Sequence, residues 1–414
     1  MEREALKLVI VGSVDHGKST LIGRLFYDTG SLPEGKMEEL RAAAQAEGKE
    51  VEFAFIMDHL REEREGAMTI DTAQAFFSGA LRDYVIIDAP GHKELLKNMV
   101  TGASQADGAV LICSAYEGVE EQTRRHAYVL KLLGLHQTIV AYNKMDLVEY
   151  DQRRFEKVRT DLREFLQQLG IEPRLEIPIS AKLGENVAQR SLNMPWYEGA
   201  TILEALDTFE LGPGAVEKPV RFPVQDVYEL DGRKVAVGRI ESGVLSRGAE
   251  LLFLPAAKRR TVADILRFEE SNIEQGTCGE CIGVALEPAE AQRGEIGCDP
   301  NSPPRPVRSF EASIFWLAHG PLNPGEELVI HCSTQEAQSR IAVIRERIDS
   351  STLECLERNA KRLEETEVGQ VTVTCDRPLV VEKFTDVPEL GRFVLVRGRN
   401  VVAGGIVTGT TNSA

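Results

Sequence analysis

The feature that most constrains this chain is a glycine-bounded turn placed between an apolar run and a helix-forming run. Residues 6–11 are nearly all apolar and predict a buried strand. The next residues, Gly12–Ser19, fit the pattern G-x-x-x-x-G-K-[ST], and residues 20–26 predict a helix. Such a turn brings backbone N–H groups and a helix N-terminus to one point, where they favour phosphate. A glycine-rich turn without a ligand is the alternative, and the flanking strand and helix argue against it.

The side chains of this turn are the first candidate site residues. Lys18 is expected to reach the β- and γ-phosphates of a nucleotide, and the Ser19 hydroxyl is expected to ligate Mg²⁺. The predicted phosphate-binding residues are Gly12, Asp15, His16, Gly17, Lys18, Ser19 and Thr20.

A second candidate element, Asp88–His92, follows the apolar run 84–87. A carboxylate at a strand end can hold Mg²⁺, which assigns Asp88 to the metal. Gly91 can offer its N–H to a γ-phosphate and move when that phosphate is lost. His92 can orient the attacking water. Alone, His92 would be interpreted as an ordinary surface histidine, but together with the phosphate-binding turn the catalytic interpretation is preferred.

A third element, Asn143–Asp146, follows the apolar run 138–141 and predicts which base is bound. The Asp146 carboxylate can accept hydrogen bonds from the N1–H and the exocyclic amine of guanine, which adenine does not offer in that geometry. Asn143 can bond the other edge of the base, and the stem of Lys144 can cover the ring. This element therefore favours GTP over ATP.

The loop after the apolar run 176–179 completes the predicted base site. The backbone of Ser180, Ala181 and Lys182 can contact the guanine oxygen there. The three elements and this loop all follow short apolar runs, so they are expected to meet at one edge of a sheet.

Short apolar runs alternate with helical periods through the first half of the chain. The clearest helical period runs from Phe155 to Leu169 and ends at Gly170. A second helix is expected to start at Thr201, because Glu204 three residues later completes a capping-box pattern. This alternation predicts a doubly wound α/β domain with a mostly parallel sheet.

Beyond residue 210 the pattern changes to strand-like alternation. Residues 211–215 resemble a linker, and apolar and polar side chains alternate at 310–316 and 371–374. A proline-rich break at 299–306 divides this half again. These signals predict one α/β domain followed by two antiparallel β domains, each a small barrel or sandwich. The expected domains are residues 1–211, 217–302 and 303–414.

Charge and composition exclude several function classes. The chain has 65 acidic and 48 basic residues and a formal charge of −17, which argues against generic affinity for nucleic acid. No run approaches the ~18–20 consecutive apolar residues of a membrane helix. The N-terminus lacks a signal-peptide pattern, and seven scattered cysteines favour reduced thiols. We therefore expect a cytoplasmic protein that is not bound to a membrane.

Two further patterns favour structural interpretations. Cys278-Gly-Glu-Cys281 would need two more ligands to hold zinc, so a hairpin with incidental thiols is preferred. The basic run 258–260 is expected to form an exposed hairpin tip rather than a nucleic-acid patch.

Together the nucleotide elements, in this order, resemble the translation-factor class of GTPases. The resemblance covers essentially the whole chain. The layout resembles that of elongation factor Tu and its relatives, which implies an α/β P-loop GTPase domain with a doubly wound, mostly parallel sheet, followed by two antiparallel β-barrel domains. It implies a further element around Thr69, within residues 64–71, where the family uses a threonine to bind Mg²⁺ and cover the γ-phosphate. The family usually has Gly-Ile-Thr-Ile there, whereas this chain has Ala67–Ile70 with a glycine one position early. The implied catalytic residues are His92, Thr69 and Lys18, and the implied metal ligands are Ser19, Thr69 and Asp88.

Within that class, four short runs look more like the large GTPase subunit of the two-subunit sulfate adenylyltransferase. They are residues 23–29, 193–199, 345–349 and 376–379. This closer resemblance implies a role in sulfate assimilation, in which GTP hydrolysis drives adenylyl sulfate synthesis from ATP and sulfate on a small adenylyltransferase subunit. The first alternative is an elongation factor Tu-like GTPase that delivers aminoacyl-tRNA to the ribosome, and a second is a regulatory GTPase with some other protein partner. Of these functions, only the elongation-factor alternative involves binding to nucleic acid.

Overall fold

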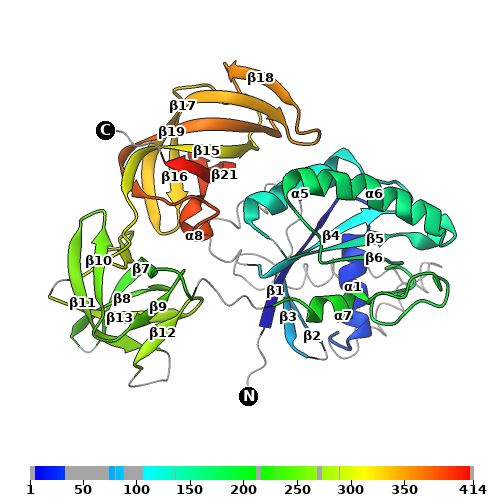
Figure 1. The fold of residues 1–414 in the computed structure, drawn as a ribbon, viewed down its shortest axis with the longest axis horizontal. Coiled ribbons are helices and arrows are strands. Elements are labelled where there is room, and N and C mark those ends of the chain that lie inside the picture. Colours follow the sequence, from blue (N-terminus) through cyan, green and yellow to red (C-terminus); the bar gives the residue numbers. More distant parts are fainter. Residues whose placement is uncertain are drawn as a thin grey trace. The chain divides into compact units, whose positions relative to one another are not determined.

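The computed structural model describes residues 5–32, 74–79, 81–87, 106–135, 137–210, 216–230, 232–267, 273–288 and 290–410. Its contacts divide the chain into two compact units. The first comprises Met1–Leu95 and Ala103–Glu210, and the second comprises Leu96–Gly102 and Leu211–Ala414. The first is an α/β unit, and the second is built of strands with one short helix, Pro388–Gly391 (α8), among its described residues (Figure 1).

A six-stranded sheet in the order β2-β3-β1-β4-β5-β6 forms the centre of the first unit. All neighbouring strands are parallel except β2, which is antiparallel to β3. The apolar runs 6–11, 84–87, 109–113, 138–141 and 176–179 predict five strands, and all five are confirmed. β2 was not predicted, because it is short and the side chain of Phe76 in it is 58% exposed. The strands are Ala5–Gly12 (β1), Gln74–Ser78 (β2), Asp83–Ile87 (β3), Gly108–Ser114 (β4), Thr138–Asn143 (β5) and Leu175–Pro178 (β6).

Helices lie on both faces of this sheet, with α5 and α6 on one side and α1 and α7 on the other (Figure 1). α6 ends where Gly170 adopts a left-handed conformation, as the sequence predicts. α7 begins with the predicted capping box, in which Thr201 and Glu204 exchange side chain–backbone hydrogen bonds. Among the described helices, none combines the length and apolar character needed to cross a membrane. The helices are Lys18–Asp28 (α1), Glu121–Leu133 (α5), Gln152–Leu169 (α6) and Ile202–Asp207 (α7), with a 3₁₀ turn, η1, at Met145–Val148.

The second unit begins with a closed barrel in the order β10-β11-β13-β8-β7-β14. The basic run 258–260 lies in its strand β11 and is not the exposed tip that we predicted. Lys258 and Arg259 are exposed, but Arg260 is 1% exposed, stacks on Phe253 and pairs with Glu295 at 3.0 Å. The strands are Arg221–Leu230 (β7), Arg233–Arg239 (β8), Val244–Ser246 (β9), Glu250–Leu254 (β10), Lys258–Leu266 (β11), Gln275–Thr277 (β12), Cys281–Glu287 (β13) and Ile296–Cys298 (β14).

A second antiparallel sheet follows in the order β16-β20-β21-β15-β19-β17-β18. A further pairing between β16 and β17 closes six of these strands into a barrel and leaves β18 at the edge. The predicted alternation is confirmed, since Phe310, Ile314, Val371 and Val373 are buried in one core. The elements are Pro306–Trp316 (β15), Glu327–Cys332 (β16), Gln335–Asp349 (β17), Cys355–Ala360 (β18), Glu367–Val380 (β19), Pro388–Gly391 (α8), Arg392–Arg397 (β20) and Asn400–Thr410 (β21).

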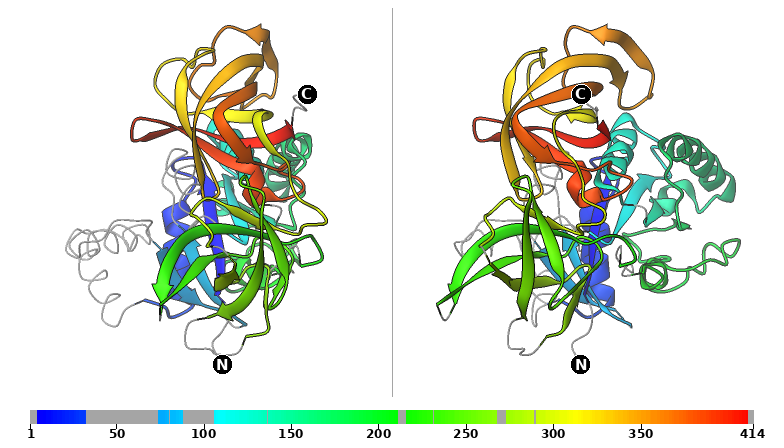
Figure 2. Two further views of the ribbon diagram at one scale, coloured as in Figure 1. Left: turned by 90° about the vertical axis from the view of Figure 1, so that its left-hand side faces the viewer. Right: turned by 60° about the vertical axis from the view of Figure 1, so that its left-hand side comes forward.

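The two β-barrels of the second unit share an apolar cluster. Figure 2 shows the first barrel in green and the second in yellow to red. The predicted α/β fold followed by antiparallel β-barrels is confirmed, whereas the exact domain boundaries stay a prediction. The shared cluster contains Leu254, Ile296, Cys298, Val380, Val387 and Leu390.

Candidate functional site

The turn after β1 has a backbone that requires glycine at Gly17. Gly17 has φ of +92° and stands directly before α1, and a Cβ at this position would clash with the amide nitrogen of Asn143. Because glycine has no side chain, no side-chain hydrogen bond caps the first turn of α1. The helix N-terminus therefore presents the open cradle of N–H groups that an anion needs.

Lys18 lies across this turn. Its Nζ donates to the carbonyl oxygens of Gly12 at 2.7 Å and Ser13 at 2.9 Å. Ser19 and Thr20 follow in the first turn of α1 and are half-buried, whereas Asp15 is exposed. The structure thus brings the predicted phosphate-binding residues together in one loop, with a fixed cation beside the helix N-terminus.

His16 is the buried member of the turn. It has 0% exposure, and its Nδ1 accepts a hydrogen bond from the Ser114 N–H at 3.3 Å. Burial lowers the pKa of His16, so the ring is neutral near pH 7 and its proton lies on Nε2. Nε2 lies 3.1 Å from Oε2 of Glu120, and the same oxygen accepts a hydrogen bond from Ser13 Oγ at 2.6 Å.

Asn143, at the end of β5, joins the phosphate-binding turn to the predicted base site. Its Nδ2 donates to the carbonyl oxygen of His16 at 2.8 Å. Its Oδ1 accepts a hydrogen bond from the Ala181 N–H, also at 2.8 Å. The amide therefore connects two loops, and its contact with the base stays a prediction.

The two charged residues of the base element have side-chain partners. Asp146 Oδ1 accepts a hydrogen bond from Ser180 Oγ at 2.6 Å, which fixes the orientation of the carboxylate. Lys144 Nζ pairs with Glu117 at 2.7 Å. Lys182 follows the buried Ala181, so all the predicted base-site residues lie at the same edge of the sheet.

Four predicted site residues lie outside the part of the chain that the structure describes. They are Thr69, Asp88, Gly91 and His92. Their roles in binding Mg²⁺, in contacting the γ-phosphate and in orienting water therefore stay predictions.

Sequence reasoning did not assign roles to Glu117, Glu120 and Arg24, which contact the predicted site residues. The two glutamates belong to a short acidic segment after β4, which is the only signal that the sequence offers for them. Nothing in the sequence pointed to a role for Arg24 in the nucleotide site, apart from its place in the run 23–29.

Comparisons with known proteins agree with this geometry. The family "Elongation factor Tu GTP binding domain" matches residues 3–211, and "GTP-eEF1A C-terminal domain-like" matches residues 309–408. A protein named elongation factor 1-alpha from Archaeoglobus fulgidus is 39% identical over 99% of both chains. Proteins of the same name from Thermoplasma acidophilum, at 40% identity over 97% of both chains, and Aeropyrum pernix, at 41% over 98% of this chain and 97% of the relative, also match.

The chain belongs to the translation-factor class of GTPases. This GTPase binds GTP and Mg²⁺. The described residues fit those ligands, because an uncapped helix N-terminus, Lys18 and a half-buried Ser19 hydroxyl meet at one loop. Bound Mg²⁺ supplies positive charge that offsets charge on the phosphates during transfer.

The prediction of a sulfate adenylyltransferase subunit is wrong, and so is the prediction of a small adenylyltransferase subunit as partner. The relatives that match over nearly the whole chain are named elongation factor 1-alpha. The four runs behind that prediction have structural roles in this GTPase. Residues 23–29 fall largely in α1, and Trp196 packs on Phe155 with ring centroids 5.3 Å apart. Residues 345–349 and 376–379 lie in β17 and β19.

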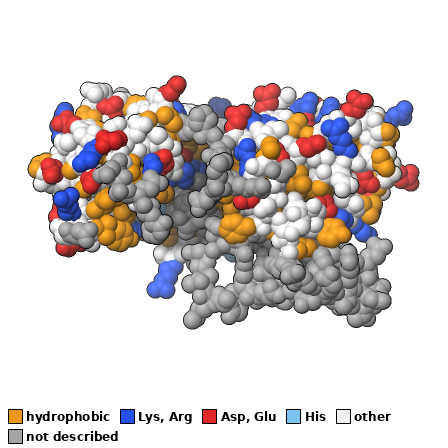
Figure 3. Space-filling model, turned by 90° about the horizontal axis from the view of Figure 1, so that it is seen from below, with side chains coloured by type: hydrophobic (Ala, Val, Ile, Leu, Met, Phe, Trp, Pro, Cys, Tyr) orange, Lys and Arg blue, Asp and Glu red, His pale blue; other side chains and the backbone are white. Residues whose placement is uncertain are grey.

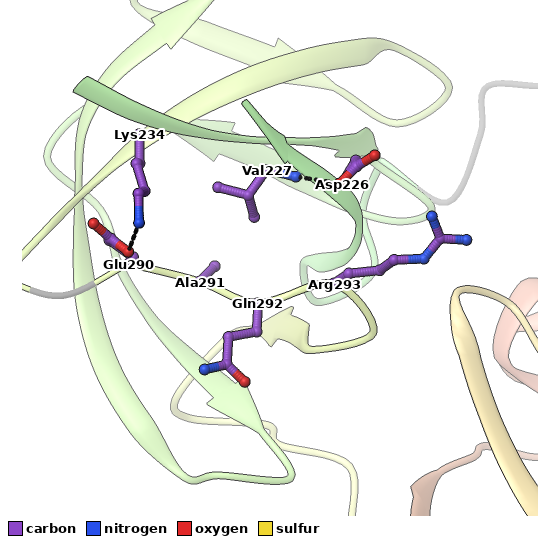
Figure 4. Close-up of a pocket in the computed structure, with 7 residues that line it drawn as sticks. All are labelled: Asp226, Val227, Lys234, Glu290, Ala291, Gln292 and Arg293. Carbon is purple, nitrogen blue, oxygen red and sulfur yellow. Dashed lines mark hydrogen bonds and ion pairs between the residues drawn. The ribbon is translucent and has the colours of Figure 1, made fainter. Parts of the chain in front are cut away.

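The second unit of this GTPase carries a pocket of about 360 Å³ on its first barrel (Figure 4). Lys234 and Glu290 form an ion pair at 2.6 Å on one side of it, while Asp226 Oδ1 accepts from the Val227 N–H at 2.9 Å. Arg293 also lines the pocket. Its lining therefore carries charges of both signs.

The two cysteines of the C-x-x-C pattern have different surroundings. Cys278 Sγ donates to the carbonyl oxygen of Glu241 at 3.1 Å, and Cys281 is exposed at the start of β13. Among the described residues, no group of three or more His, Cys, Asp and Glu side chains is arranged to hold a metal ion.

Proposed function

We propose that this GTPase is an elongation factor that delivers aminoacyl-tRNA to the ribosome. The observation that carries the proposal is similarity over nearly the full chain, at 39–41% identity, to three proteins named elongation factor 1-alpha. The match of the C-terminal family to residues 309–408 extends this support to the second barrel. The proposal places the protein in the cytoplasm, and all seven cysteines are free, which is consistent with reduced thiols.

In this proposal the site residues divide into three groups. Lys18 and the backbone of the turn around Gly17 hold the phosphates. Asp146 and the loop of Ser180, Ala181 and Lys182 hold guanine, together with Asn143 and Lys144. Ser19, Thr69 and Asp88 hold Mg²⁺, and His92 orients the water that attacks the γ-phosphate.

The proposed RNA contact must rely on local side chains rather than on overall charge. The chain carries a formal charge of −17, which repels a polyanion as a whole. On the face drawn in Figure 3, acidic and basic side chains of the described residues are interspersed. A face of this kind neutralises few phosphates, so RNA binding through it should depend only weakly on salt concentration.

The test is protection of aminoacyl-tRNA from spontaneous deacylation. The full chain, loaded with a non-hydrolysable GTP analogue, should slow the loss of the amino acid, and the GDP-loaded chain should not. The matched control is uncharged tRNA, which should compete poorly. Equal rates of deacylation with the GTP analogue, with GDP and without protein would contradict the proposal.

A further inference from the structure

Arg24 joins two parts of the nucleotide site that lie far apart in the sequence. It lies on α1, the helix that begins in the phosphate-binding turn. Its Nε donates to the carbonyl oxygen of Ala181 at 3.2 Å, and its Nη2 donates to that of Lys182 at 2.5 Å. The side chain is 12% exposed; its bond to Ala181 is partly buried, whereas its bond to Lys182 lies at the surface. The helix is therefore tied to the loop that follows β6.

The guanidinium of Arg24 is itself held in place. Asp28, one helical turn later, approaches it with 3.6 Å between Nη1 and Oδ1. The ring centroid of Tyr27 lies 5.5 Å from the guanidinium carbon. Burial raises the pKa of Asp28, and the charge of Arg24 opposes that rise. A planar guanidinium group that is fixed in this way points its N–H donors, which form a rigid fork, in one direction.

The loop has a backbone that leaves room for this fork. Gly184 has φ of +81°, and a Cβ on it would lie 3.2–3.4 Å from atoms of the Arg24 guanidinium. Ser180 and Ala181 are both fully buried. A side chain at position 184 would thus crowd the arginine as well as strain the turn.

The same loop orients the residues that are predicted to read the base. The N–H of Ala181 donates to Asn143, and the hydroxyl of Ser180 donates to Asp146. Arg24 binds carbonyl oxygens of the loop. The backbone N–H of Ala181 and the hydroxyl of Ser180, in the same loop, bind Asn143 and Asp146. A displacement of the loop would therefore move both base-reading side chains.

We propose that Arg24 is a positioning residue for guanine recognition, which fixes the loop 180–184 against α1 and so sets how tightly the base is held. The contacts that carry this proposal lie on the base side of the site. Loss of Arg24 is therefore expected to weaken nucleotide binding and to leave the hydrolytic step intact. The proposal rests on guanine-nucleotide binding alone, so its failure would leave the tRNA proposal standing.

The test compares Arg24→Gln and Arg24→Lys with the control Arg159→Gln in the full chain. Arg159 is also a helix arginine, with an ion pair to Glu156 at 2.7 Å and the ring of Phe155 at 5.4 Å, but it lies on α6. The dissociation constant for GDP is measured by calorimetry, and kcat and KM are measured for GTP hydrolysis.

Arg24→Gln is expected to raise the Kd for GDP and the KM for GTP about tenfold or more, because charge-assisted bonds to two carbonyls are lost. Arg24→Lys should give a rise of about threefold or more, since an ammonium cannot reproduce the fork. In both variants kcat at saturating GTP should stay within about twofold, and Arg159→Gln should match the wild type.

Two results would overturn the proposal. One is a Kd for GDP within about twofold of the wild type in Arg24→Gln, or in Arg24→Lys should the glutamine variant fail to fold. The other is a fall in kcat as large as the loss of affinity, which would place Arg24 in the hydrolytic step.

Discussion

Nε2 of His16 lies 3.1 Å from Oε2 of Glu120, so a buried imidazole of the phosphate-binding turn faces a carboxylate from the segment after β4. The other ring nitrogen accepts a hydrogen bond from Ser114, which fixes the tautomer. Glu120 opposes the effect of burial on the histidine, but burial is the larger influence and the pKa of His16 is lowered.

We predict that acidification destabilises the first unit partly through His16. The folded pKa lies below the ordinary value of 6.5, so below about pH 6.5 the unfolded chain binds a proton that the folded chain does not. The free energy of unfolding should therefore fall with decreasing pH, by at most about 1.4 kcal/mol per pH unit from this group. Melting temperatures of the nucleotide-free protein between pH 7.5 and 5.5 should fall more steeply in the wild type than in His16→Gln. The control is His319→Gln, whose side chain is 85% exposed, and equal slopes in wild type and His16→Gln would contradict this prediction.

Asp146→Asn should change the base preference of the GTPase. The carboxylate is positioned by Ser180. Replacement by an amide exchanges one of its two acceptor oxygens for an NH2 donor, which would face a donor of guanine at the predicted base site. The change should weaken the binding free energy of GDP by about 2 kcal/mol or more, which corresponds to a roughly thirtyfold lower affinity. Affinity for xanthosine diphosphate should rise, because its 2-oxo group can accept from the new amide. Calorimetry with both nucleotides checks this, with the exposed Asp161→Asn as control, and an unchanged preference for GDP would exclude Asp146 from base recognition.

His92→Ala should separate hydrolysis from binding. If His92 orients water, its loss should lower the single-turnover rate of GTP hydrolysis about 10²-fold and leave GTP affinity nearly unchanged. Lys18→Ala should instead lower affinity, because Lys18 is the fixed cation of the phosphate-binding turn. Rapid-mixing hydrolysis and calorimetry on both variants are the measurements. Hydrolysis by His92→Ala at the wild-type rate would remove this residue from the mechanism.

Arg221→Ala should weaken the junction between the two barrels of the second unit. Arg221 is 3% exposed and binds Glu382 at two points, with Nε–Oε2 at 2.6 Å and Nη2–Oε1 at 3.0 Å. Removing Arg221 leaves the charge of Glu382 poorly solvated and should lower the free energy of unfolding by about 3 kcal/mol. The double variant Arg221→Met with Glu382→Leu should lose less stability, because neither charge remains. Urea unfolding of the single and double variants measures both effects. A double variant whose loss of unfolding free energy equals the sum of the losses in the two single variants would contradict this account.

The sequence predicted most of the first unit because its signals are local. Hydrophobic runs identified five strands, and the capping box at Thr201 and the left-handed Gly170 mark helix ends by chemistry within one turn. The phosphate-binding turn and the element Asn143–Asp146 were also predicted from patterns of a few neighbouring residues. β2 was missed because a short, partly exposed strand carries no strong periodicity.

The sequence could not predict pairings between distant segments. The closure of the second barrel through β16 and β17, and the burial of Arg260 against Glu295, depend on how strands pack in three dimensions. The prediction of a sulfate adenylyltransferase subunit was wrong for another reason, since it depended on a resemblance in four short runs, whereas the relatives that match nearly the whole chain are named elongation factor 1-alpha.

By itself, then, the sequence determined the strand–turn–helix around Gly12–Ser19 and the alternation of α/β and β segments, and it predicts the guanine element. These features follow from backbone geometry and hydrophobic periodicity over a few neighbouring residues. Only the tertiary structure decided that Glu120 faces His16, that Arg24 holds the carbonyls of Ala181 and Lys182, and that Arg221 binds Glu382. Such contacts are set by chain closure and packing across the fold, and no local pattern of residues encodes them.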